Sequence, residues 1–181
     1  MTLTVITPPG EEALSLAAAK AFLRVGHDAE DALIADLIAG VRARLEEAAG
    51  LALVARALRQ TFHAWPSALH RRGIALRPGP VTELTAVRLI DAQDEETDVT
   101  DRFTLAGSRL CLKPGSAVLM IAIGARVEVD FDAGFGAASD IPEDLVHALK
   151  LILLEAYRRN GATSLPDEAE AIIAARREVL L

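Results

Sequence analysis

Four histidines and one cysteine are the side chains most able to bind a metal or act as nucleophiles, and they are scattered along the chain. His27, His63, His70 and His147 have no second histidine at the spacing of a metal site. Cys111 is the only cysteine, which excludes an internal disulfide. We therefore expect no metal and no cofactor. Because Cys111 lies between two leucines, we expect it to be a small residue of the core.

The segment Gly134-Phe-Gly136 is the one glycine motif that could approach a phosphate. A dinucleotide-binding loop would have a third glycine where Ser139 stands, and its helix would already have begun at Pro142. We interpret the motif as a turn between a strand and a helix, where glycine adopts backbone angles that other residues resist. No catalytic constellation stands out, so we predict that the protein is not an enzyme. A small enzyme or ligand-binding domain with a site at Gly134 to Gly136 is an alternative.

The composition indicates which elements must position these residues. Of the 181 residues, 51% are hydrophobic but only 4% are aromatic, so the core must be aliphatic, which suits packed helices. The N-terminus has no basic region followed by an apolar stretch, as a signal peptide would. The longest apolar run, residues 117–125, is far shorter than the roughly 20 residues of a membrane span. We expect a reduced, intracellular protein with no membrane partner.

Two helices are predicted near the N-terminus. Residues 15–25 form the first, with Ser15 as its cap and Gly26 in a left-handed turn at its end. Asp28 caps the second, with Asp31 in a capping-box position, and Gly50 ends it. Its apolar residues recur at three- and four-residue steps: Leu33, Ile34, Leu37, Ile38, Val41 and Leu45. This stripe must pack against another element.

Short β-prone runs separated by turn residues predict a small antiparallel sheet. They are residues 58–65, 74–77, 85–90, 103–105, 109–112, 118–123 and 127–131. In the last run valine and phenylalanine alternate with acidic residues, which is the pattern of a strand with one face in water.

Helices return after Asp140, which we expect to cap a helix with Pro142 in its first turn. Residues 145–160 are apolar nearly all round and are predicted to be the most buried helix. Pro166 opens a last helix. The predicted fold class is α+β: one domain over residues 1–181, with a helical core from residues 12–50 and 141–181 and an inserted sheet from residues 54–133.

The last helix leaves two alternatives open. Ile172 and Ile173 lie along one side of it, and Leu180 and Leu181 follow at its end. The helix either folds back onto the stripe of the second helix or docks onto another protein. We predict docking, because apolar residues at the end of a chain are poor partners for water.

The charges are distributed unevenly along the chain. A net charge of −7 argues against nucleic-acid binding, which needs clustered lysine and arginine. Residues 49–82 contain no acidic residue but include Arg59, Arg71 and Arg72, whereas residues 91–101 contain acids and no base. These runs are either solvated loops and strand faces or complementary patches that meet between neighbouring subunits. The second interpretation makes the three arginines candidate contact residues.

The order of several short segments resembles one known family. The segments are Val127-Glu-Val-Asp-Phe-Asp-Ala-Gly-Phe-Gly136, Asp140-Ile-Pro-Glu-Asp-Leu-Val-His-Ala-Leu-Lys150 and Leu154-Glu-Ala-Tyr157-Arg-Arg159, with Phe22-Leu-Arg24-Val and Val87-Arg-Leu-Ile-Asp91 before them. They are similar to the head–tail connector, or adaptor, proteins of long-tailed phages and gene transfer agents. Phe135 stands where the family usually has a tyrosine. The resemblance covers roughly residues 12–160.

This resemblance implies a structural subunit that forms a ring on the portal and joins a DNA-filled head to a tail. The particle would be a phage, a prophage or a gene transfer agent. The implied partners are the portal protein, neighbouring copies in a dodecameric ring, and a stopper or tail protein, without specific nucleic-acid binding. The protein would be cytoplasmic during assembly and then part of the neck. A head-completion stopper or a tail terminator is the alternative within the same particle.

Overall fold

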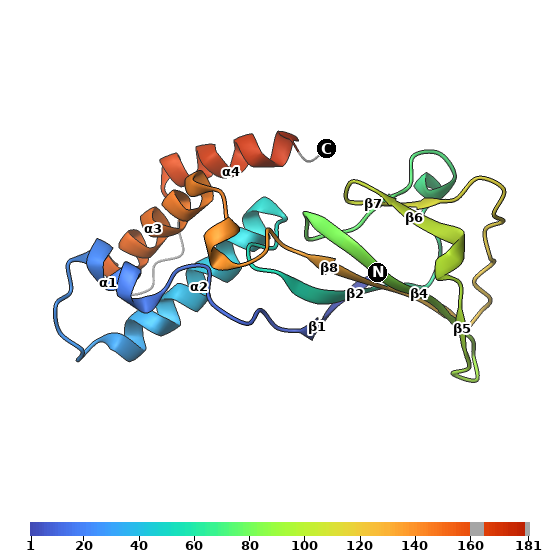
Figure 1. Ribbon diagram of the computed structural model, residues 1–181, viewed down its shortest axis with the longest axis horizontal. Helices are drawn as coiled ribbons and strands as arrows, with labels where there is room; N and C mark the ends of the chain where they lie inside the picture. The colour runs from blue at the N-terminus through green and yellow to red at the C-terminus, as the bar shows by residue number, and fades with distance from the viewer. Residues whose placement is uncertain (160–164, 180–181) are drawn as a thin grey trace. The chain divides into compact units, whose positions relative to one another are not determined.

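The computed structural model describes residues 1–159 and 165–179, apart from the side chains of His70, Glu178 and Val179, and it divides the chain into two compact units (Figure 1). A β unit contains Met1–Pro8 and Ala55–Gly134. A helical unit contains Pro9–Val54 and Phe135–Leu181. The predicted α+β fold class is confirmed.

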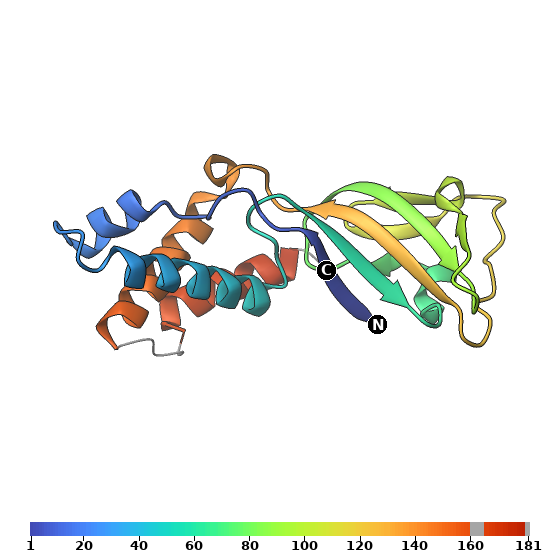
Figure 2. The same cartoon turned by 90° about the horizontal axis from the view of Figure 1, so that it is seen from below.

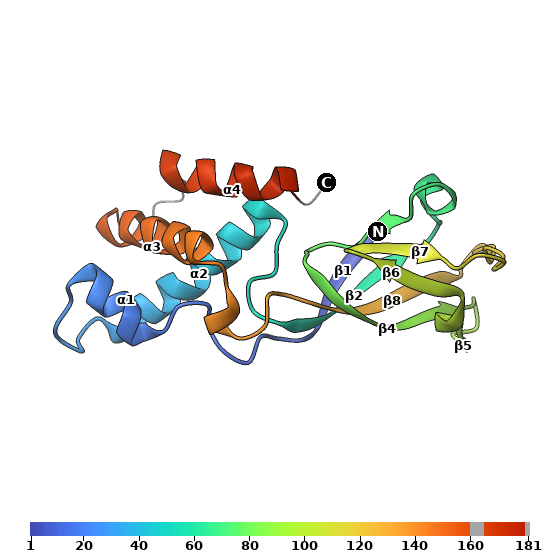
Figure 3. The ribbon, with the colours of Figure 1, turned by 45° about the horizontal axis from the view of Figure 1, so that its top comes forward.

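Two antiparallel sheets form the β unit, and β6 of the smaller sheet contacts β4 of the larger one (Figure 3). The larger sheet has the strand order β1 (Thr2–Thr7), β2 (Arg56–Phe62), β8 (Arg126–Ala133), β4 (Val81–Ile90) and β5 (Glu96–Asp98). The smaller sheet has the order β3 (Ile74–Ala75), β7 (Arg109–Leu112) and β6 (Phe103–Ala106). Since β8 lies in the middle of the larger sheet, it pairs on both sides with strands distant in sequence, β2 and β4.

Three segments of the β unit differ from the sequence prediction. Glu96–Asp98, which no predicted run included, forms the short strand β5 and pairs with β4. Thr2–Thr7, which no predicted run included, forms the edge strand β1 and pairs with β2. Residues 118–123 were predicted to be a strand but pair with no strand among the described residues. They lie in the loop between β7 and β8, where Val118, Leu119 and Ile121 are partly buried and Met120 and Ile123 are exposed.

The exposure of the acidic side chains on β8 also differs from the prediction. The alternation of residues 127–132 correctly indicated a strand, but Glu128 and Asp130 are only 8% and 7% exposed. The expectation of a face in water is wrong at these two positions, because Arg59 and Arg88 from the neighbouring strands, and Arg126 of β8 itself, cover the carboxylates.

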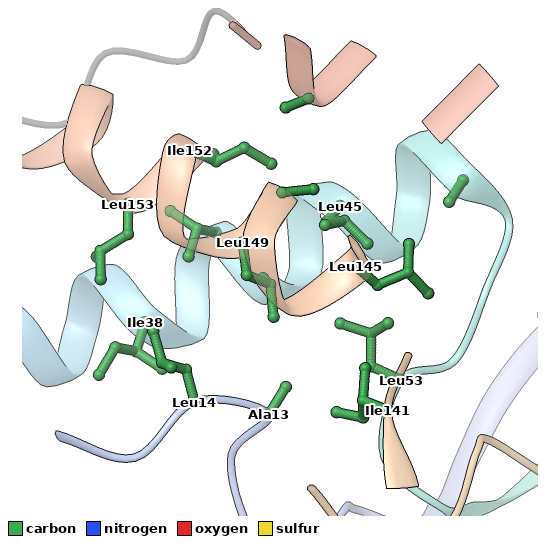
Figure 4. Packing of buried hydrophobic residues seen from close by; sticks show 14 of the residues in the cluster. Ala13, Leu14, Ile38, Leu45, Leu53, Ile141, Leu145, Leu149, Ile152 and Leu153 are labelled. Carbon is green, nitrogen blue, oxygen red and sulfur yellow. The ribbon is translucent and has the colours of Figure 1, made fainter. Parts of the chain in front are cut away.

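The described part of the helical unit contains the α-helices α1 (Leu16–Leu23), α2 (Asp31–Ala49), α3 (Glu143–Arg158) and α4 (Asp167–Val179). Both α3 and α4 pack on α2, and α1 packs against α2 and α3 (Figure 2). The stripe of α2 enters the core at Ile34, Ile38, Val41 and Leu45, as predicted, although Leu33 is exposed. Figure 4 shows residues of α2 and α3 meeting Ala13, Leu14, Leu53 and Ile141 from the flanking segments.

At the ends of α1 and α2, some of the capping residues differ from those predicted. Ser15 does cap α1, accepting a hydrogen bond from the Ala18 amide at 3.2 Å. The left-handed residue that ends α1 is Arg24, with φ 60°, instead of Gly26. Asp28 makes no cap, because its carboxylate binds the ammonium of Lys20, as the carboxylate of Asp31 also does. Gly50 ends α2 in a left-handed conformation, as predicted.

At the start of α3 the predicted capping residues are also wrong. Pro142 is the residue before the first turn of the helix, and it makes no side-chain cap. Asp140 accepts instead from the Ala137 amide at 2.9 Å, which closes a short 3-10 turn before the helix. The helix is amphipathic and not apolar all round: Leu145, Leu149 and Ile152 are buried, whereas His147 is exposed.

The docking prediction for the last helix is wrong for its described part. Ala169 is fully buried and Ile173 is 4% exposed, and both belong to the core cluster of the helical unit. Ile172 packs against the same cluster while keeping part of its surface in water. The guanidinium of Arg176 also binds the carboxylate of Asp144 on α3 with two hydrogen bonds. Leu180 and Leu181 lie outside the described residues. No helix within residues 1–159 and 165–179 is long and apolar enough to cross a membrane.

Candidate interaction surfaces

The residues first considered for chemistry do not converge on a site. Among the described residues, no three histidine, cysteine, aspartate or glutamate side chains form a group that could hold a metal ion. Cys111, expected in the core, is only half-buried, because its neighbour Leu110 takes the inward position on β7. A Cβ on Gly73 would lie 2.5 Å from the Cys111 sulfur, so Gly73 is needed for this close approach.

The turn that contains Gly134 and Gly136 connects β8 to the segment before α3. Gly134 and Gly136 have φ angles of 130° and 122°, which other residues rarely adopt. A Cβ on Gly136 would lie 2.5 Å from a carboxylate oxygen of Asp140. The space beside Gly136 is therefore occupied by a negatively charged group, which disfavours a phosphate there. This geometry supports the interpretation as a strand-to-helix turn.

A network of charges covers the middle of the larger sheet. Arg59 on β2 lies opposite Asp130 on β8 and binds both of its oxygens, at 2.7 and 2.9 Å. Arg88 on β4 lies opposite Glu128 and donates a hydrogen bond to the Asp130 carboxylate. Glu128 in turn contacts Arg59 at 2.8 Å and Arg126 at 3.1 Å. Each buried carboxylate thus contacts at least two guanidinium groups.

The electrostatics of this network favour the charged form of Arg59 and of Arg126. The hydrogen bond to Asp130 is the main reason that the pKa of Arg59 is raised. The hydrogen bonds to Glu128 and then Asp94 raise the pKa of Arg126. Glu128 and Asp130 are thus paired with arginines within the chain. Sequence reasoning missed this network, because Arg59 and Asp130 are 71 residues apart.

Of the three arginines expected to contact a partner, one makes its ion pairs within the chain and two are exposed. Arg59 is occupied by the network on the sheet. Arg71 and Arg72 are exposed, just after the 3-10 helix Ser67–His70, and no described carboxylate lies within 4.0 Å of either guanidinium. The carbonyl of Arg72 accepts a hydrogen bond from Arg109 at 2.8 Å, which fixes this segment against β7. Arg71 and Arg72 are therefore the candidates for an intermolecular contact.

The acidic run at residues 91–101 is partly used within the chain. Asp91 accepts hydrogen bonds from the amides of Gln93 and Glu95 and so shapes the turn before β5. Asp94 binds Arg126 at 2.9 Å. The hydrogen bonds from Thr100 lower the pKa of Asp98. The exposed carboxylates of Glu95 and Asp101 make no ion pair with a described residue, so they remain candidates for a partner.

Exposed hydrophobic residues of the β unit mark two surfaces that the sequence interpretation did not identify. On β1, Leu3, Val5 and Ile6 are all exposed. In the loop after β7, Met120 is 90% exposed and Ile123 is completely exposed, at 101%. The available signal was the absence of charge in residues 2–7 and 114–125, beside the apolar run already noted.

Comparison with known proteins places the whole chain in one structural context. No protein-family model and no curated protein matches it. Solved structures do match it, and three of them are similar over 98% of this chain and 95% of the other. The neck of an empty GTA particle computed with C6 symmetry contains a chain 31% identical, with a TM-score of 0.84. The virion of a native gene transfer agent contains one 33% identical, with a TM-score of 0.82. The neck of a native GTA particle computed with C12 symmetry contains one 32% identical, with a TM-score of 0.75.

Proposed function

The chain belongs to the head–tail connector family, and we propose that it is the adaptor subunit that joins the DNA-filled head of a phage-like particle to its tail. The observation that carries the proposal is the match along nearly the whole of both chains to neck proteins of gene transfer agents. The chain is accordingly a structural neck subunit, and the adaptor position is the specific role proposed for it.

In this role the subunits form a ring on the portal, with a stopper or tail protein on the other side. The neck structures that contain similar chains have C6 and C12 symmetry, which supports a ring, and we assign it as a dodecamer. Each copy in a closed ring must present two different surfaces, one to each neighbour. The ring would assemble in the cytoplasm before the tail joins. Its net negative charge per subunit, −7, would let DNA pass without binding to it.

Co-expression with the portal protein of the same particle, followed by purification and negative-stain imaging, tests this assignment. An adaptor is expected to form a ring seated on the portal in the absence of every other neck protein. Binding only to the end of a purified tail tube would identify a tail terminator instead. Binding only to a portal that already carries another ring would identify a stopper.

We propose that Arg71 and Arg72 contact acidic groups of a neighbouring copy or of the portal, because both are exposed and lack a described carboxylate partner. The double variant Arg71→Glu, Arg72→Glu is expected to keep the melting temperature within about 1–2 °C of the unmodified protein, since exposed substitutions change stability little. It is expected to reduce ring formation on the portal. A single exposed ion pair contributes only about 0–1 kcal/mol, but a ring repeats the contact.

The matched control is Lys113→Glu with Arg177→Glu, which makes the same charge change at two other exposed positions. If both double variants assemble to the same extent as the unmodified protein, Arg71 and Arg72 do not contribute to the interface.

A further inference from the structure

The two edges of the larger sheet differ in how they are protected against pairing with another strand. One edge is β5, a three-residue strand that carries Glu96 and Asp98, both exposed. The other is β1, which has six residues, no charged side chain and no burial of any of its positions. Short length and charge protect an edge, whereas a longer uncharged edge offers its free amides and carbonyls to another chain. The β1 edge therefore lacks the protection that β5 has.

The loop between β7 and β8 contains a segment that, like β1, is uncharged and has backbone amides available for pairing. Residues 118–123 are all apolar and uncharged, and within the described chain none of their amides donates to a backbone carbonyl. Trp65 holds the segment in place, because its indole N–H donates to the Leu119 carbonyl at 2.9 Å while its ring stacks on Phe62. Met120 and Ile123 project into water. The segment is thus anchored at one point but leaves its amides unpaired.

Within one folded subunit, residues 118–123 do not pair with the free edge of β1. In all three ribbon views the loop between β7 and β8 lies away from β1 (Figures 1, 2 and 3). In a ring, however, every copy meets its two neighbours through two different surfaces, so one copy's loop and another copy's edge can form the same contact around the whole ring. Similar chains occur in necks with C6 and C12 symmetry, and this chain carries both halves of such a contact.

We propose that residues 118–123 of one subunit pair with the free edge of β1 in the neighbouring copy, adding a strand to its sheet. Backbone hydrogen bonds would supply the pairing, and the exposed apolar side chains of both segments would be buried together. The occupant of the edge is a second copy of this chain, because the two uncharged segments match in character and ring closure requires unlike surfaces to meet. This inference rests on the proposed ring.

Disulfide trapping tests the contact in rings assembled on the portal. In a Cys111→Ser background, Val5→Cys and Met120→Cys are made in separate proteins and in one doubly substituted protein, with Ile123→Cys as a second position on the loop. Under mild oxidation the mixture of the two single variants is expected to give a covalent dimer, whereas each single variant alone gives none. The doubly substituted protein is expected to give a ladder of covalent oligomers. Thr97→Cys on the protected edge β5, mixed with Met120→Cys, is the matched control.

Lysine substitution gives a second readout that does not depend on cysteine geometry. Val5→Lys and Met120→Lys change exposed positions and are expected to leave the isolated subunit folded but to abolish ring formation on the portal. Rings that form without the expected cross-links and tolerate both lysines would overturn the edge contact while leaving the adaptor function intact. A covalent dimer from Val5→Cys alone would show that two β1 edges meet symmetrically, which also overturns it. If no ring forms on the portal even from the unmodified chain, both the adaptor role and the edge contact are wrong.

Discussion

Replacing Ile173 by aspartate is expected to lower the free energy of unfolding of the helical unit by about 3–5 kcal/mol, because it removes a buried aliphatic side chain and puts a carboxylate in its place. Ile173 is 4% exposed and lies in the core that α4 shares with α2 and α3. The neighbouring change Ala174→Asp alters an exposed position of the same helix and is expected to cost less than about 1 kcal/mol. Urea unfolding followed by circular dichroism measures both.

This comparison decides between the two roles considered for the last helix. A helix that serves only to dock would tolerate Ile173→Asp without loss of stability, and the variant would fail only when heads and tails join. Equal stability of Ile173→Asp and Ala174→Asp would therefore contradict the packing of α4 in the core.

Replacing Asp130 by alanine is expected to destabilise the β unit by about 2–4 kcal/mol. The change leaves the guanidinium of Arg88 without its hydrogen-bonded partner and removes two hydrogen bonds from Arg59. Breaking a fully buried pair costs about 3–5 kcal/mol, and the partial exposure of both arginines to water reduces that cost.

Asp132→Ala is the control for Asp130→Ala, because Asp132 lies on the same strand and makes no side-chain ion pair with a described residue. It is expected to change stability by less than about 1 kcal/mol. Thermal unfolding of the two variants at neutral pH compares them directly. A loss for Asp130→Ala no larger than that for Asp132→Ala would show that the network adds nothing to the fold.

The helical unit could be predicted well from the sequence, because its signal is local. The three- and four-residue spacing of apolar side chains identified α2 and its buried face, and the glycine at position 50 identified its end. The capping residues were less predictable. Asp28 is chemically suited to cap a helix, but Lys20 competes for its carboxylate from eight residues away.

In the β unit, local sequence patterns do not predict which strands pair or which side chains are buried. The alternation in β8 indicates a strand, yet whether its acids face water depends on Arg59 and Arg88, which belong to strands 71 and 42 residues away. The strand β1 has a β-prone sequence, but its pairing with β2 joins residues that are fifty or more positions apart. Residues 118–123 have strand-like composition but pair with no strand in the part of the chain that the structure describes, which composition alone does not reveal.

The family resemblance rested on short segments, and the structure gives two of their residues a physical role. Tyr157 donates a hydrogen bond to the Glu30 carboxylate and so joins α3 to the residue just before α2. Phe135, which replaces the usual tyrosine, packs its ring against the core, and its amide donates to the Leu53 carbonyl at 3.1 Å. These contacts connect segments distant in sequence, so the order of the segments was more informative than any one motif.

An electron cryo-microscopy reconstruction of the neck of the particle that contains this chain is the most direct test of its role. An adaptor is expected to appear as one closed ring of this chain, in direct contact with the portal on one side and with the next neck or tail protein on the other. Density for this chain that makes no contact with the portal, or its absence from the neck of complete particles, would contradict the adaptor assignment.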